Sequence, residues 1–139
     1  MSPDDAPLLQ VHDLKVHFPL TAGVLRRRAI GTVKAVDGVS FSLQRGETLG
    51  LVGESGCGKS TTSLAVLRMH PVTEGRIVFE GHDITQQTAG AFRRRMQMVY
   101  QDPYGSLDPR MTVRDIVAEP LDVDGLAGTR SERDARVAR

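Results

Sequence analysis

The chain of 139 residues contains a single cysteine, Cys57, so no disulfide can form within it. Proteins whose thiols are kept reduced in the cytosol typically have such a composition, and the cysteine count therefore favours a reduced, cytosolic setting. The four histidines show no spacing typical of metal ligands, and one cysteine cannot build a zinc site.

Long apolar runs are also absent from the sequence. No stretch approaches the ~18 apolar residues that a membrane-spanning helix needs. The first ten residues, MSPDDAPLLQ, hold two acids and no apolar core of signal-peptide length, so secretion has no support. If the protein works at a membrane, we expect it to do so through a partner protein.

Neither sign of charge dominates. The 18 basic and 17 acidic residues leave a net charge of +1, which gives no electrostatic footprint for nucleic acid. Two basic runs, Arg26–Arg28 and Arg93–Arg95, are short and lack interleaved aromatic residues. They favour solvated faces or docking contacts, and we expect no nucleic-acid partner.

Several short segments, of which the first alternates loosely between apolar and polar residues and that at 47–52 is a short apolar run, are predicted to be strands. They are residues 8–18 (a half-buried strand pair), 34–43 (around an Asp37-Gly38 turn signal), 47–52, 76–80 and 96–100. Residues 21–32, which hold two glycines and a basic run, predict a loop or insertion.

Helical patterns lie between and after these segments. Residues 62–69 and 89–95 have helical composition, Thr112 is predicted to cap another helix, and a further helix is predicted to open at Ser131. The length and this mixture fit one α/β domain or part of one.

One loop stands out by its glycines. Residues 53–61, GESGCGKST, fill the pattern G-x-x-x-x-G-K-S/T. Glycines let the backbone turn tightly and press its N–H groups against an anion, and the following helix directs its unpaired amides at the same anion. We expect Lys59 to reach the terminal phosphates and the Ser60 hydroxyl to ligate magnesium.

The context of this loop supports a nucleotide site, because an apolar segment precedes it and a helical segment follows it. The alternative is a glycine-rich turn with an incidental lysine. The predicted nucleotide-binding residues of the loop are Gly53, Glu54, Ser55, Gly56, Cys57, Gly58, Lys59, Ser60 and Thr61. The loop alone does not choose between kinases, GTPases and transport ATPases.

Three segments resemble the nucleotide-binding domain of an ABC transporter. They are residues 35–61, 74–85 and 96–113, and the last looks like the Q loop of that family, with Gln101 at the position that meets magnesium and the attacking water. The resemblance implies an α/β fold with a P-loop NTPase core and an N-terminal antiparallel β subdomain.

Two stretches narrow the resemblance to one subfamily. QDPYGSLDPRMTV and the inserted arm between Phe18 and Val33 are similar to the ATPases of oligopeptide and dipeptide importers, whose relatives also carry nickel and glutathione. Asp108 departs from the pattern, because relatives often have asparagine there. The cargo itself cannot be read from these residues.

The resemblance also assigns roles outside the loop. Phe18 matches the aromatic residue that stacks on adenine, the alternative being a core phenylalanine. Gln101 would sense the metal and water, the alternative being a polar strand-end residue. Tyr104 and Leu107 could contact a coupling helix of the membrane subunit or belong to an ordinary surface loop. For Cys57 we expect maleimide labelling that bound ATP prevents, the alternative being an unreactive small residue.

The implied activity is ATP hydrolysis with Mg²⁺, which would power import. The implied partners are two membrane-spanning permease subunits, a second ABC ATPase in a homo- or heterodimer, and indirectly a substrate-binding protein. The implied location is peripheral, at the cytoplasmic face of the inner membrane.

Hydrolysis requires parts that we do not find in these 139 residues. In this family they are an LSGGQ-like signature, an aspartate–glutamate pair that ends a later strand, and a switch histidine. We therefore expect residues 1–139 to be the N-terminal portion of one nucleotide-binding domain, without turnover on their own. One hypothesis is an importer ATPase whose remainder is unrecorded or supplied elsewhere. The alternative is a truncated fragment that at most binds nucleotide or does not fold stably. An unrelated P-loop kinase would need a different continuation after Gln101.

Overall fold

The computed structural model describes residues 6–22, 28–87, 92, 94–102, 105–126 and 128–138. These residues form two units, one within Met1–Gln97 and one within Met98–Arg139, and each is described by itself.

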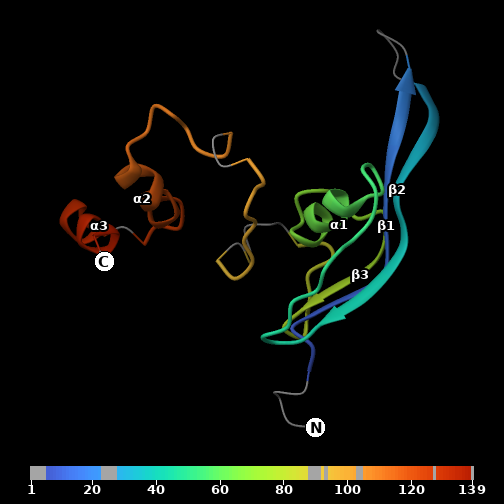
Figure 1. The fold of residues 1–139 in the computed structure, drawn as a ribbon, viewed down its shortest axis with the longest axis horizontal. Helices are drawn as coiled ribbons and strands as arrows, with labels where there is room; N and C mark the ends of the chain where they lie inside the picture. Colours follow the sequence, from blue (N-terminus) through green and yellow to red (C-terminus); the bar gives the residue numbers. More distant parts are fainter. Residues whose placement is uncertain are drawn as a thin grey trace. The chain divides into compact units, whose positions relative to one another are not determined.

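An antiparallel sheet is the framework of the first unit (Figure 1). Its strands are β1 (Leu9–Ala22), β2 (Arg28–Leu43), β3 (Glu74–Phe79) and β4 (His82–Asp83), in the spatial order β2-β1-β3-β4. Helix α1 (Lys59–Val66) lies against β1 and β2. The strand predicted at residues 76–80 is thus confirmed as β3.

The pair β1–β2 is longer than the sequence predicts. It runs from Leu9↔Leu43 to Ala22↔Arg28, whereas β3 pairs with β1 only along Leu9–Lys15. The predicted loop at 21–32 is therefore wrong at both its ends, because β1 continues to Ala22 and β2 begins at Arg28. We call residues 19–22 and 28–33, a two-stranded ribbon beyond β3, the arm.

The Asp37-Gly38 signal marks a bulge and not a turn. Leu14 pairs with Val39 and Lys15 with Asp37, so Gly38 is an extra residue in β2. Its φ of +88° is the left-handed conformation that glycine adopts in such bulges. The Asp37-Gly38 pair, which favours a reversal of the chain, thus forms a bulge within one continuous strand.

One face of the sheet and α1 enclose the core. Its buried residues are Leu9, Val11, Leu14, Val16, Val36, Ala65, Val66, Ile77, Phe79, Ile84 and Phe92. Val11 and Leu14 are three positions apart and would point to opposite faces of a regular strand. The irregular register between them, where Asp13 has a φ of +46°, turns both side chains inward.

Two predicted strands do not form. Residues 47–52 and 96–100 lie outside the sheet, and Val52 and Val99 are each 95% exposed. Among the described residues the sheet consists of β1 to β4, so neither segment has a neighbouring strand to bond with. A strand requires a partner for its N–H and C=O groups, and the apolar pattern does not supply one.

The helices follow their predicted caps with small shifts. α1 begins three residues before the predicted position, and Arg68, with a φ of +59°, ends it. α2 (Val113–Val123) has Thr112 as its N-cap, as predicted, and α3 (Arg130–Val137) is capped by Thr129, ahead of the predicted start. The helix predicted at 89–95 lies largely outside the described residues. None of the described helices is long and apolar enough to cross a bilayer.

The basic run at residues 93–95 takes part in folding through its last member. Arg95 pairs with Glu80, which also accepts a hydrogen bond of 2.7 Å from Arg45, and the Arg95 guanidinium lies 5.6 Å from the centroid of the Phe79 ring. Arg93 is outside the described residues. Arg95 is therefore a structural cation at the end of β3.

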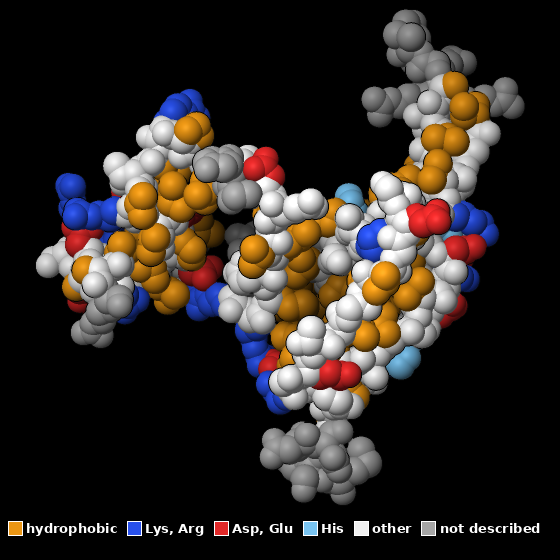
Figure 2. Space-filling model, viewed as in Figure 1, with side chains coloured by type: hydrophobic (Ala, Val, Ile, Leu, Met, Phe, Trp, Pro, Cys, Tyr) orange, Lys and Arg blue, Asp and Glu red, His pale blue; other side chains and the backbone are white. Residues whose placement is uncertain are grey.

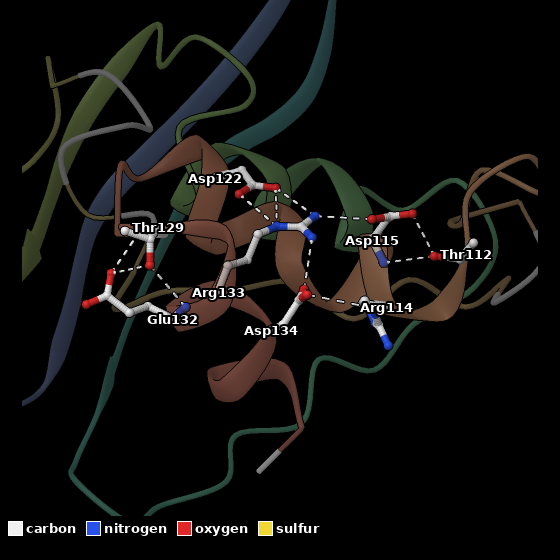
Figure 3. Close-up of polar contacts among 8 residues, drawn as sticks. All are labelled: Thr112, Arg114, Asp115, Asp122, Thr129, Glu132, Arg133 and Asp134. Carbon is white, nitrogen blue, oxygen red and sulfur yellow. Dashed lines mark hydrogen bonds and ion pairs between the residues drawn. The ribbon is translucent and has the colours of Figure 1, made fainter.

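In the second unit, Arg133 joins α2 to α3 (Figure 3). Its guanidinium donates to Asp115 at 3.2 Å and to Asp122 at 3.1 Å, and it also faces Asp134 of its own helix. Hydrogen bonds from Thr112 and Arg133 hold the pKa of Asp115 below its usual range. The Thr129 backbone and hydroxyl do the same for the pKa of Glu132.

We expect Ile77→Ala to lower the free energy of unfolding of the first unit by roughly 2–5 kcal/mol, because Ile77 is fully buried and leaves a cavity. Ile30→Ala is the matched control. Ile30 is 65% exposed, so its truncation should stay within about 0.5 kcal/mol. Amide hydrogen exchange of β1 and β3 measures both, and equal losses would contradict the assignment of the core.

We expect the α2–α3 pairing and the N-terminal cap of α3 to weaken in acid. Both Asp115 and Glu132 have lowered folded pKa values, so their stabilisation is complete above the unfolded values of about 3.9 and 4.3. It disappears as pH falls through the lower folded values. Helix content, measured by circular dichroism between about pH 6 and 2, should show this loss. Arg133→Ala should make the part of the loss that is due to Asp115 smaller.

Candidate functional site

The backbone of the glycine-rich loop approaches β2 closely at Gly58. This residue is the N-cap of α1 and has a φ of +95°. A Cβ atom at this position would lie 2.3 Å from the carbonyl oxygen of Ala35 in β2. The motif therefore requires glycine here for close approach as well as for its backbone angle.

The N-terminus of α1 is available to an anion. Its N-cap makes no side-chain hydrogen bond, and its first turn holds no acid. The first amides of a helix, here those of Lys59, Ser60 and Thr61, have no partners within the helix. Together with the positive end of the helix dipole, they favour a bound phosphate.

Lys59 folds over the loop that precedes it. Its Nζ donates to the carbonyl oxygens of Gly53 at 2.8 Å and Glu54 at 2.6 Å, and lies 3.4 Å from the Sγ of Cys57. An ammonium group held by neutral carbonyls beside a helix N-terminus adds charge where the backbone already attracts anions. The loop and the first turn of α1, which holds no acid, thus combine a cation with free amides.

The remaining loop residues differ in exposure, and their roles stay predictions. Glu54, Ser55, Gly56, Cys57 and Ser60 are exposed, and Thr61 is half-buried. The Ser60 hydroxyl is a hard oxygen ligand of the kind that Mg²⁺ prefers. Among the described residues no group of three or more His, Cys, Asp or Glu side chains could hold a metal.

Phe18 lies near the point where the glycine-rich loop approaches β2. It pairs with Val33 of β2. Two residues after Val33 comes Ala35, whose carbonyl oxygen lies close to Gly58. The Phe18 ring is half-buried against the core and meets His70 edge to face, with centroids 5.4 Å apart. The buried part of the ring therefore fits the alternative that Phe18 is a core phenylalanine, and adenine stacking stays a prediction. No spacing in the sequence marks His70 as its neighbour.

His17, which precedes Phe18 in β1, takes part in a polar cluster that the sequence did not predict. His17 Nε2 lies 2.9 Å from Asp37 Oδ1, and Lys34 donates to the other oxygen of Asp37 at 3.0 Å. Lys34 and His17 together hold the pKa of Asp37 below its usual range. These contacts fix β1 against the bulge of β2.

Gln101 belongs to the second unit and is exposed. Its metal and water contacts stay a prediction. Leu107 is 51% exposed, as a docking residue or a surface loop would be, and Tyr104 lies outside the described residues. Asp108 pairs with Arg110 at 3.1 Å, which lowers the Asp108 pKa.

Comparison with known proteins places these features in one family. The sequence model of the family described as ABC transporter matches residues 36–139. The chain is 47% identical to the oligopeptide transport ATP-binding protein AppF of Bacillus subtilis (strain 168), over 94% of this chain and 40% of AppF. It is 49% identical to OppF of the same strain, over 94% of this chain and 41% of OppF.

A third relative carries a different cargo in its name. The glutathione import ATP-binding protein GsiA of Escherichia coli (strain K12) is 50% identical over 88% of this chain and 20% of GsiA. The chain thus spans less than half the length of each of these relatives.

Solved structures agree on the fold. The dimeric ATP-binding cassette MJ0796, described as bound to ADP and Pi, matches with a TM-score of 0.70 at 19% identity, over 94% of this chain and 54% of that chain. The ATP-binding cassette MJ1267 matches with a TM-score of 0.60 at 26% identity, over 82% and 41%. The antiparallel sheet with its loop and α1 is therefore the predicted α/β architecture.

We expect Gly58→Ala to destabilise the first unit more than Gly56→Ala. Both glycines have a positive φ, which costs an alanine roughly 1–2 kcal/mol. Only at Gly58 does the new methyl also meet a backbone oxygen, whereas no atom lies within 4 Å at Gly56. Urea denaturation followed by far-UV circular dichroism measures the difference, and equal midpoints would show that α1 is not seated on β2 in solution.

Proposed function

The chain belongs to the ABC transporter family, and we propose that it carries the ATP-binding part of an ATPase subunit that powers import of oligopeptides or dipeptides. The names of AppF and OppF support a peptide cargo, and that of GsiA keeps glutathione as a neighbouring possibility. The proposal concerns the whole protein, of which residues 1–139 would be the N-terminal portion of one nucleotide-binding domain.

The observation that carries the proposal is the arrangement of Lys59 over the loop at the uncapped N-terminus of α1. A triphosphate brings several negative charges to this point. Its oxygens can replace the carbonyls of Gly53 and Glu54 as acceptors for the Lys59 ammonium, and they are better acceptors because they are charged. The glycines keep side chains out of their way.

Each loop residue then has a distinct task. The amides of Gly56 and Gly58 and of the first turn of α1 orient the phosphates, and Lys59 neutralises their charge. Ser60 would hold Mg²⁺, which would stabilise the charge that develops on the phosphates. Gln101 would orient the water beside that ion, because an amide can both accept and donate.

Phe18 would support the adenine base. A ring stacked on a base is worth roughly 1–3 kcal/mol and tolerates different bases. The edge contact with His70 would hold the ring in place while one face receives the base.

The partners follow from the proposed activity. Two permease subunits would receive the motion, a second ABC ATPase would complete the pair of nucleotide sites, and a substrate-binding protein would deliver the cargo. The subunit would then lie at the cytoplasmic face of the inner membrane.

Labelling of Cys57 tests the nucleotide site directly. Cys57 is an exposed free thiol within the loop. We expect maleimide to modify it, and saturating Mg-ATP to slow the modification, because phosphates would fill the space beside Sγ. Lys59→Ala should weaken ATP binding by at least ~30-fold, because it removes one partner of a close charge pair. Mg-ATP should then no longer protect Cys57 from maleimide.

The ratio of labelling rates with and without nucleotide is the quantity to compare, since Lys59 also contacts Sγ directly. Lys34→Ala is the matched control, because Lys34 pairs with Asp37 outside the loop and should leave protection unchanged. Equal labelling of the unmodified sequence with and without saturating Mg-ATP would sink the proposed site.

A further inference from the structure

A second bulge in β2 receives the glycine-rich loop. The register of β1 and β2 shifts between Val16 and His17, which leaves Ala35 as an extra residue without a partner in β1. The extra residue of a bulge stands outside the ladder, so its carbonyl group can point to another segment. The carbonyl oxygen of Ala35 is the atom that a Cβ at Gly58 would meet at 2.3 Å. The shape of this Ala35 bulge therefore decides where the loop and the start of α1 lie.

The ring of His17 joins β1 to β2 beside the Ala35 bulge. Acidic and basic side chains adjoin along this strand pair (Figure 2). His17 Nε2 lies 2.9 Å from Asp37 Oδ1. Because Lys34 and His17 hold the pKa of Asp37 below its usual range, the carboxylate is ionised at neutral pH and only accepts, so Nε2–H donates. The His17 side chain is only 16% exposed, and water therefore competes little for this hydrogen bond.

The backbone of His17 holds the segment that follows α1. Its N–H donates to the Thr73 hydroxyl at 2.8 Å, and the Thr73 N–H donates to the carbonyl oxygen of Lys15 at 2.8 Å. Thr73 lies between the end of α1 and the start of β3. The helix is thus attached to the strand pair on both sides, before its first turn through Gly58 and after its end through Thr73. His17 takes part on both sides.

We infer that His17 is a positioning residue of the nucleotide site, and that it acts through the backbone of the loop without contacting the nucleotide. Its ring fixes the Ala35 bulge that receives Gly58, and its N–H fixes the segment after α1. Weaker contacts at His17 would lower the fraction of molecules whose loop is ready to bind, and the apparent affinity falls by the same factor. The inference rests on the proposed function, because it assigns a role in nucleotide binding.

Lys34 offers a matched control within the same cluster. Its ion pair with Asp37 joins two residues of β2, whereas the His17 ring bonds across the two strands. The Lys34 side chain is 60% exposed, and exposed ion pairs contribute little stability. Lys34→Ala should therefore leave the Ala35 bulge and the nucleotide affinity unchanged, although it removes a neighbour of the same carboxylate.

Titration with Mg-ATP tests the role of His17. The affinity is given by the concentration of Mg-ATP that halves the rate at which maleimide labels Cys57. His17→Ala should raise this concentration about tenfold, the factor that corresponds to one hydrogen bond to a charged group. His17→Gln should restore most of the affinity, because its side-chain amide can donate to Asp37. Urea midpoints measured alongside show that each variant is folded under the binding conditions.

Inorganic tripolyphosphate separates an effect on the loop from an effect on the base. His17 precedes Phe18, but a ligand without a base cannot report on Phe18. We expect His17→Ala to weaken Mg-ATP and Mg-tripolyphosphate by the same factor. A loss confined to Mg-ATP, or an unchanged affinity for both ligands, would overturn the inference.

The attachment after α1 supplies an independent pair of variants, which also serves where His17→Ala does not fold. Thr73→Val removes the acceptor of the His17 N–H and keeps the shape of the side chain, whereas Thr73→Ser keeps the acceptor. We expect Thr73→Val to weaken Mg-tripolyphosphate severalfold and Thr73→Ser to bind it like the unmodified chain. Equal affinities of the two variants would contradict the role of this attachment.

Hydrogen exchange of the Thr62 amide reports on the start of α1 without any ligand. This N–H donates to the carbonyl oxygen of Gly58 at 2.8 Å. His17→Ala should speed its exchange, and Lys34→Ala should not. Equal exchange in both variants would refute the coupling of His17 to the loop, even if nucleotide binds. If neither ligand protects Cys57 in the unmodified chain, the proposed function fails; if both protect it and His17→Ala is protected equally well, only the role of His17 fails.

Discussion

The close approach of Gly58 to the carbonyl of Ala35 is the constraint on which the rest of the first unit depends. It sets the start of α1 on β2, and thereby aims the unpaired amides of the helix at the space over the loop. The same approach brings the loop near Phe18, since the β1–β2 register places Phe18 opposite Val33. Sheet pairing, helix capping and the candidate phosphate site therefore share one backbone contact.

Sequence reasoning succeeded where short-range chemistry decides the structure. The spacing of Gly53, Gly58 and Lys59 identified the loop, and the hydroxyl of Thr112 identified a helix start, because both depend on neighbouring residues. It failed where distant partners decide. Residues 47–52 have the composition of a strand, but strand pairing is a property of two segments, and the pattern of one cannot reveal the other's absence.

Local and long-range information conflict most clearly at Gly38. The Asp-Gly pair favours a turn, yet pairing along β1 on both sides outweighs that preference, so the residue is absorbed as a bulge. The candidate site shows the same division. The motif predicts that a helix follows the loop that holds Lys59 and Ser60, and α1 begins there. The His70 contact of Phe18 and the His17–Asp37 pair arise from strand register, which no local pattern in this sequence encodes.

The uncovered apolar segment at residues 47–52 has a consequence for how the protein is made. A ribosome releases the chain from its N-terminus, so this segment emerges early and stays a bare, strand-like sequence until a pairing partner reaches it. During that interval it is a template for association with other nascent chains. Leu49 and Val52, which are 42% and 95% exposed, are among the apolar side chains that this template presents.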